Sequence, residues 1–226
     1  MEDVVAAAVA FVGTHFLLSH PLRAPIANRI GARGFLGLYS VVAFATLIWL
    51  VIAYRASPVA PLLWPVGGAL WAVASIVMLV ASVLLMGSLI RNPALPEMKT
   101  DIVPDARGVF AITRHPMMWA FALWGAAHIL IYPEPSNIVV ALAIILLALV
   151  GAALQDRKKE TLQPEFWREW ERRTSYWPFA AIADGRARLG GFGMHALAGG
   201  LIVWLVASWA HIPLSGWHAG IWYWLS

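Results

Sequence analysis

Histidines are the side chains of this sequence most able to do chemistry, because the apolar segments around them hold almost no carboxylates. The chain has seven: His15, His20, His115, His128, His195, His211 and His218. Neutral imidazole is a common ligand of b-type haem, and a histidine inside a membrane span is costly unless it binds a partner. The sequence contains no cysteine, which excludes disulfides, thiolate metal sites and covalent haem attachment at CxxCH.

The elements that position these histidines are membrane spans. Hydrophobic residues make up 61% of the 226, and charged residues only 12%, about half the share usual in a globular domain. Six apolar runs approach the roughly 20 residues needed to cross a bilayer. They cover about 4–19, 35–54, 67–90, 116–132, 137–154 and 194–212. We therefore expect an all-α fold: a polytopic bundle of about six transmembrane helices, forming one integral membrane domain over 1–226.

Basic residues predict the orientation of this bundle. All of the 16 Lys and Arg residues except Arg55 fall in the first, third and fifth connections, at 20–34, 91–115 and 155–193. Basic connections stay in the cytoplasm, so both termini are expected outside, in the periplasm of a bacterium with the chain in its inner membrane. This bias also accounts for the net charge of +4. The expected partner is therefore the lipid bilayer, and no nucleic-acid partner is expected.

Two further segments are expected to lie at the membrane surface. In "QPEFWREWERRTSYWPF" (163–179), Pro164 suits a first helical position, and Phe166, Trp167 and Trp170 share one side of the helix. This pattern predicts an amphipathic helix on the cytoplasmic leaflet. The C-terminal region 194–226 consists of the last span and a tail. This tail, 213–226, is too short to cross the membrane and is expected in the outer interface.

The spans sort the histidines by depth. His15, near the cytoplasmic end of the first span, and His115, at the cytoplasmic start of the fourth, reach a similar depth and can face each other as haem ligands. His20 is a rival on the same side, but five residues at about 100° each place it about 140° from His15. His128 is the other rival, roughly 20 Å from His115 along the helix. His195, His211 and His218 are expected at the interfaces.

Arg114 and His115 stand directly before the fourth span, in "TRHP" (113–116). Pro116 suits the first helical position, so the free N–H groups of the helix start and the Arg114 guanidinium predict an anion site facing the cytoplasm. A haem propionate would satisfy this site, and so would the carboxylate of S-adenosylmethionine. The alternative is that Arg114 only anchors the helix at the membrane surface.

Four segments carry a resemblance to a known family. They are "FVGTHFLLSHPLR" (11–23), "IGARGFLGLYS" (30–40), "GVFAITRHPMMWAFALWGAAHIL" (108–130) and "DRKKETLQPEFWREWERRTSYWPFAAI" (156–182). Together they resemble the NnrU family and the related plastid 15-cis-zeta-carotene isomerase, over about 8–182. The resemblance implies an integral membrane protein linked to the nitrite and nitric oxide reductases of denitrification. For the isomerase relative it implies b-type haem with histidine axial ligands, matched here by His15 and His115, with a further family histidine at His128. Gln155 stands where the isomerase branch is expected to have histidine, which argues against isomerase activity.

The stretch around "RHP" also resembles that of membrane methyltransferases. Those enzymes complete their site with two adjacent glutamates downstream, whereas the candidates here are Asp156 and Glu160. Three hypotheses follow. The first is a haem-binding NnrU-like protein that supports denitrification, or does redox chemistry on a small hydrophobic substrate or nitric oxide. The second is an S-adenosylmethionine-dependent methyltransferase, and the third a non-enzymatic membrane assembly factor.

Overall fold

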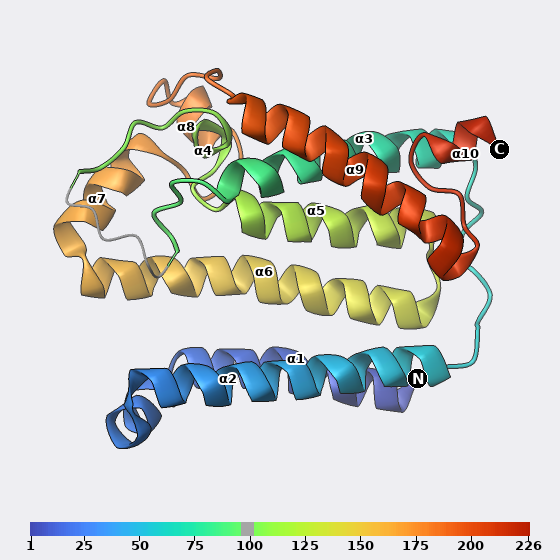
Figure 1. The fold of residues 1–226 in the computed structure, drawn as a ribbon, viewed down its shortest axis with the longest axis horizontal. Helices are drawn as coiled ribbons and strands as arrows, with labels where there is room; N and C mark the ends of the chain where they lie inside the picture. The colour runs from blue at the N-terminus through green and yellow to red at the C-terminus, as the bar shows by residue number, and fades with distance from the viewer. Residues whose placement is uncertain (96–101) are drawn as a thin grey trace.

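The regular structure of the chain is helical, as predicted. The computed structural model describes residues 1–95 and 102–226, and every element of regular secondary structure in these ranges is a helix (Figure 1). The six long apolar helices are α1 (Glu2–Ser19), α2 (Arg23–Ala56), α3 (Gly68–Ser88), α5 (Pro116–Ile131), α6 (Pro135–Leu162) and α9 (Met194–Ser215). The short ones are α4 (Val109–Ile112), α7 (Pro164–Arg173), α8 (Ala180–Ala183) and α10 (Trp222–Leu225).

The apolar helices match the predicted spans, with two differences in length. In the described residues, five are long and apolar enough to cross a membrane, whereas α5 has 16 residues and rises only about 24 Å. Helix α2 begins well before the predicted span, at Arg23, and is interrupted at Gly31, where φ is +77°. Glycine accepts this left-handed conformation without steric cost, so the basic start of α2 turns away from its apolar part.

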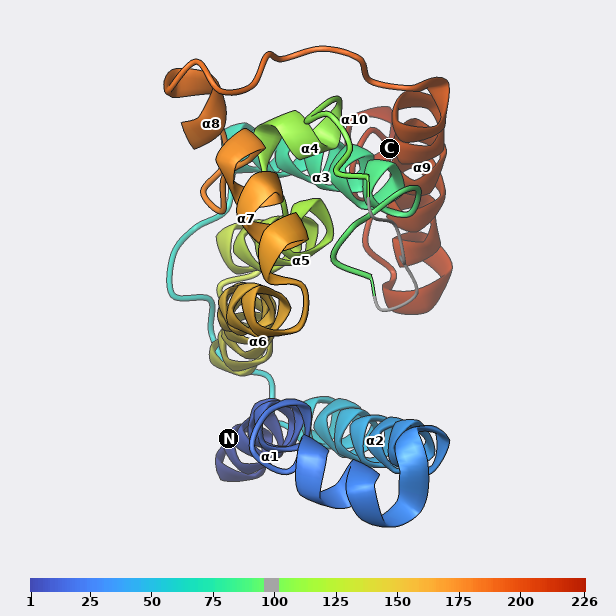
Figure 2. The ribbon, with the colours of Figure 1, turned by 90° about the vertical axis from the view of Figure 1, so that its left-hand side faces the viewer.

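The helices are arranged in layers around α6. Helices α1 and α2 pack together on one side of α6, whereas α5 packs on its other side, followed by α3 and then α9 (Figures 1 and 2). Small residues permit the close approaches: a side chain at Gly125 of α5 would meet Ile145 of α6, and one at Gly200 of α9 would meet the backbone of Val83 in α3. Helix α6 therefore separates α1 from α5, the two helices expected to share a haem.

The predicted amphipathic helix is present as α7, but its aromatic face is not left for the lipid surface. Trp167 and Trp170 are both 0% exposed, and Trp170 lies with its ring 5.8 Å from that of Phe110 in α4. The ends of α3 and α5 complete this core, which provides α7 with an apolar protein surface to pack against. The C-terminal tail is likewise held by the protein, because the ring of Tyr223 stacks on that of Trp71 at 4.8 Å.

Candidate functional site

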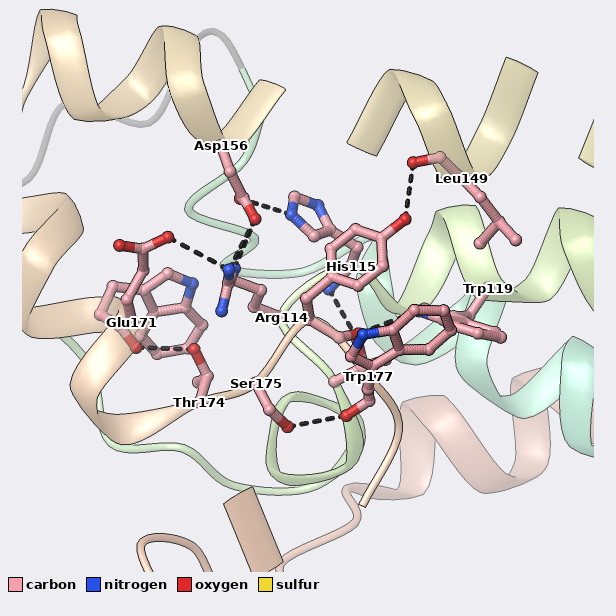
Figure 3. A network of polar contacts seen from close by, with 12 residues as sticks. Arg114, His115, Trp119, Leu149, Asp156, Glu171, Thr174, Ser175 and Trp177 are labelled. Carbon is pink, nitrogen blue, oxygen red and sulfur yellow. Dashed lines mark hydrogen bonds and ion pairs between the residues drawn. The ribbon is translucent and has the colours of Figure 1, made fainter. Parts of the chain in front are cut away.

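Arg114 and His115 bind the same carboxylate at one end of the bundle (Figure 3). The imidazole Nε2 of His115 lies 2.6 Å from Oδ1 of Asp156, on α6. Arg114 donates from Nε to Oδ2 of Asp156 at 2.8 Å and also pairs through Nη2 with Oε1 of Glu171, on α7, at 3.1 Å. We call Arg114, His115, Asp156 and Glu171 the polar cluster.

The backbone around the polar cluster is positioned by the segment that follows α7. The hydroxyl of Thr113 and the indole N–H of Trp119 both donate to the carbonyl oxygen of Tyr176, at 2.7 and 3.0 Å. The N–H of Arg114 donates to the carbonyl of Ser175 at 2.8 Å. The two stretches that carried the family resemblance, around 113–116 and 173–179, are thus bonded to each other and set the start of α5.

In the polar cluster, one guanidinium is paired with two carboxylates. The side chains of Arg114, His115 and Asp156 are 12%, 1% and 8% exposed. Partial burial raises the pKa of Glu171; the neighbouring Arg114 opposes this shift and Asp156 adds to it. The anion site predicted at Arg114 is therefore filled by the protein's own carboxylates. Sequence reasoning considered Asp156 only as a methyltransferase residue and missed Glu171; a carboxylate near the end of a long apolar helix was the available signal, because it needs a partner.

His15 lies away from His115. Its Nδ1 donates to the carbonyl of Phe11, one turn earlier in α1, at 2.6 Å, and its ring packs edge-on against Tyr39 of α2. Helix α6 stands between α1 and α5, so the structure does not bring the predicted ligand pair together (Figure 2). His20 ends α1, where burial and the nearby Lys158 lower its pKa.

A second pair of histidines meets at the opposite end of the bundle, the end where both termini lie (Figure 1). His128 of α5 and His211 of α9 have ring centroids 6.2 Å apart, with 30° between the ring planes. Each Nδ1 donates to a carbonyl one turn earlier in its own helix, that of Trp124 at 2.8 Å and that of Ala207 at 2.7 Å. His128 was considered as a rival ligand, and its pairing with His211 was not foreseen.

The facing histidines line a cavity of about 110 Å³ between α3, α5 and α9, which we call the α3–α5–α9 cavity. It shares Trp71, Ile131, Ala219 and both histidines with an adjoining space of about 260 Å³. Its walls are mainly apolar and aromatic, but Ser75 Oγ and Trp204 Nε1 are buried there without a hydrogen-bond partner among the described residues. Both atoms have almost no accessible surface, as do the unpartnered indole N–H groups of Trp167 and Trp170, so the facing imidazoles are the polar feature of this cavity.

Haem b does not fit the pair His15 and His115. The Nε2 of His115 is engaged by Asp156, and its side chain is only 1% exposed, which leaves no face for a porphyrin. His128 and His211 fit imidazole ligation better because their ring centroids lie only 6.2 Å apart. As at His15, each Nδ1–H donates to a backbone carbonyl, a support that metal-binding histidines usually have, and this leaves Nε2 as the second nitrogen.

The helices and these two sites define an α-helical integral membrane protein. The chain belongs to the NnrU family, whose model, described as NnrU protein, matches residues 4–219. Over 82 residues it is 37% identical to a curated relative, 15-cis-zeta-carotene isomerase, chloroplastic, of Zea mays. That alignment covers 36% of this chain and 22% of the relative, so the similarity is to a small part of the isomerase. No solved structure matches the chain.

Proposed function

We propose that this NnrU-family protein binds a small hydrophobic molecule in the α3–α5–α9 cavity and acts in redox chemistry that supports nitrite and nitric oxide reduction. The observation that carries the proposal is the pair of imidazoles, His128 and His211, that lie close together on a mainly apolar cavity. Ligand sites are typically apolar pockets with a few convergent polar groups. The protein acts in the bacterial inner membrane, with this cavity at the periplasmic end.

Each side of the cavity has a defined part in this function. The aromatic walls, including Trp71 and Trp124, take apolar surface of the molecule out of contact with lipid and water. The Nδ1–H bonds leave each neutral imidazole to accept at Nε2. The two imidazoles would therefore orient a group of the molecule that donates a hydrogen bond.

The polar cluster has a different role, which is to tie α5, α6 and α7 together. A methyltransferase would need the Arg114 guanidinium for the carboxylate of S-adenosylmethionine, whereas Asp156 and Glu171 already bind it. Opening such a buried, paired cluster is expensive, so we assign it to structure and not to turnover.

Haem b is a second candidate occupant, because His128 and His211 lie close together on one cavity. Either histidine would hold the group through its imidazole, and the haem would supply one-electron chemistry there. The test is the visible spectrum of protein purified from haem-replete cells. A Soret band that shifts on reduction, disappears in His128→Ala and survives in His115→Ala would support this candidate. A spectrum without a Soret band would rule it out.

The proposed function is tested by filling the cavity. Denitrifying cells that lack their own copy are complemented with Ser75→Phe, which fills the α3–α5–α9 cavity, or with Val73→Phe, a matched change on the same helix at a side chain that is 50% exposed. Membrane levels of each variant are measured, and nitrite and nitric oxide consumption are followed. We expect Val73→Phe to restore consumption and Ser75→Phe not to restore it.

A smaller change protects this test against misfolding of Ser75→Phe. His211→Leu removes one of the two imidazoles of the cavity while keeping an apolar side chain there, and it should also lower nitrite and nitric oxide consumption. Full complementation by both Ser75→Phe and His211→Leu would contradict a ligand in the cavity and would favour an assembly factor.

A further inference from the structure

Two adjoining clefts lie at the end of the bundle that holds α4, α7 and α8, opposite the termini (Figure 1). One, of about 470 Å³, is formed mainly by the end of α3, by α4 and by the start of α9, and we call it the apolar cleft. The other, of about 700 Å³, lies between 105–107 and 185–191, and we call it the arginine cleft. The two clefts share Asp105, Arg107 and Gly191, so one extended molecule can contact both.

The arginine cleft has an excess of positive charge. Its charged lining residues are Arg107, Arg173, Arg186, Arg188 and Asp105, so one carboxylate faces four guanidiniums among the described residues. Asp105 pairs with Arg107 at 2.9 Å, but these side chains are 64% and 75% exposed. Such an exposed ion pair contributes little, so it does not hold the two groups against a competing anion.

Two of the guanidiniums at the clefts have no carboxylate partner. Arg188 in the arginine cleft and Arg91 in the apolar cleft are exposed, and neither makes an ion pair with a described residue. Arg173 and Arg186, in contrast, each pair with a carboxylate outside the cleft, at 2.7 and 2.9 Å. Arg91 also has φ of 53°, a conformation that suits glycine better, so the backbone does not explain an arginine at this position. An anionic ligand would provide both arginines with a counter-charge.

The depth of the clefts favours a lipid over a soluble anion. Helices α3 and α9 have 21 and 22 residues and rise about 31 and 33 Å, close to the thickness of the hydrocarbon core of a bilayer. The end of α3 and the start of α9, where the apolar cleft lies, therefore reach the headgroup layer. Large apolar side chains stay exposed beside the arginines there: Ile90 is 48% and Met194 77% exposed.

We propose that the two clefts bind an anionic phospholipid of the cytoplasmic leaflet, with its phosphate group at Arg91 and Arg188 and the start of an acyl chain in the apolar cleft. The walls of that cleft, which include Ile90, Val109 and Phe192, suit the chain. Basic pockets between membrane helices on the cytoplasmic side bind anionic headgroups in this way. A zwitterionic headgroup would bring its own cation to the arginines, so the net charge of the lipid decides binding. This inference is independent of the proposed function, because it concerns the opposite end of the bundle.

The test measures which lipids stay with the purified full chain. The protein is reconstituted in nanodiscs that contain equal parts of phosphatidylcholine and phosphatidylglycerol and is then extracted mildly into detergent. The lipids retained per mole of protein are quantified by mass spectrometry. We expect phosphatidylglycerol to be enriched about 25-fold over phosphatidylcholine, because each of two arginines contributes about fivefold. Arg188→Gln and Arg91→Gly should each reduce the enrichment to about fivefold.

Arg168→Gln is the matched control. Arg168 is an exposed arginine of α7 at the same end of the bundle, and it lines neither cleft, so its variant should keep the enrichment of the wild type. Arg91→Gly protects the test against misfolding, because glycine accepts the backbone conformation there. Its melting temperature in detergent should equal or exceed that of the wild type.

Three results would overturn the lipid site. The first is equal enrichment of phosphatidylglycerol in the wild type, Arg91→Gly and Arg188→Gln. The second is an equal loss of enrichment in Arg168→Gln, which would assign the effect to diffuse surface charge. The third comes from melting temperatures measured with added phosphatidylglycerol or inorganic phosphate: an equal rise with both would mean that a soluble phosphate compound, and not a lipid, occupies the clefts.

Discussion

The rings of His128 and His211 face each other at 6.2 Å although α5 and α9 are separated in sequence by α6, α7 and α8. Both helices pack against α3, and this shared contact sets the two rings on one cavity. Each ring is held by a bond from Nδ1 to its own helix, so the pair is positioned without a carboxylate. This arrangement is an oriented pair of acceptors within an apolar wall.

Asp156→Asn should destabilise the protein strongly. The carboxylate binds both His115 and Arg114, and removing its charge leaves Arg114, whose side chain is only 12% exposed, with Glu171 alone. Breaking a buried ion pair costs about 3–5 kcal/mol, and because Glu171 remains we expect about 3 kcal/mol. The measurement is unfolding of the detergent-solubilised protein. Asp184→Asn is the control, because the ion pair between Asp184 and Arg186 is exposed and should contribute less than about 1 kcal/mol. Equal losses in the two variants would contradict a buried cluster.

Glu134 should make the stability of the protein depend on acidity. It is 2% exposed and accepts hydrogen bonds from the Asn137 N–H at 3.0 Å and the Ser136 hydroxyl, at the start of α6. Burial alone would raise its pKa, but the bonds from Ser136, Asn137 and the Ala60 N–H lower it below the ordinary 4.5. A lowered folded-state pKa stabilises the protein fully above about 4.5, and this stabilisation is lost as the pH falls through the folded value.

The comparison that checks this is unfolding of the wild type and Glu134→Gln from pH 7 to pH 3. We expect Glu134→Gln to lose about 1 kcal/mol at neutral pH, the usual contribution of a helix cap, and to lose less than the wild type on acidification. Glu165→Gln, at an exposed position of α7, serves as the control. Parallel pH profiles for the wild type and Glu134→Gln would refute the assignment.

Two adjacent glycines of α9 should respond differently to alanine. A Cβ at Gly200 would lie 2.7 Å from the Cα of Val83, in the backbone of α3, whereas a Cβ at Gly199 would lie 3.0 Å from the flexible end of Met86. Backbone yields less than a methionine tip, so Gly200→Ala should cost about 1–3 kcal/mol and Gly199→Ala under about 1 kcal/mol. Thermal unfolding of both variants distinguishes them; the opposite order would mean that α3 and α9 do not pack as closely as described.

Reporter fusions test the orientation expected from the basic residues. Fusions at Ser57 and Ser136 should report the periplasm and one at Gly185 the cytoplasm, because all but one of the Lys and Arg residues lie on the opposite side from Ser57 and Ser136. A cytoplasmic signal at Ser136 would reverse the assignment and place the α3–α5–α9 cavity at the inner leaflet.

Hydropathy and charge predicted the helical class, the apolar helices and the existence of α7, because these depend on local sequence. Partners between helices were harder to predict, since they depend on which helices become neighbours. His15 and His115 were expected to meet from their similar depth and from the family resemblance, but α6 lies between their helices. The pairing of His128 with His211 could not be predicted without knowing that α5 and α9 both pack against α3. Trp167 and Trp170 had the right periodicity, yet their burial depended on α4, which hydropathy did not distinguish.

The presence of a bound molecule in the α3–α5–α9 cavity is tested most directly by mass spectrometry of what the protein carries from its own membrane. Wild type, Ser75→Phe and Val73→Phe are purified in parallel in the same detergent, and their organic extracts are compared per mole of protein. The account predicts one hydrophobic molecule present in the wild type and in Val73→Phe and depleted in Ser75→Phe. Identical extracts from all three proteins would contradict it.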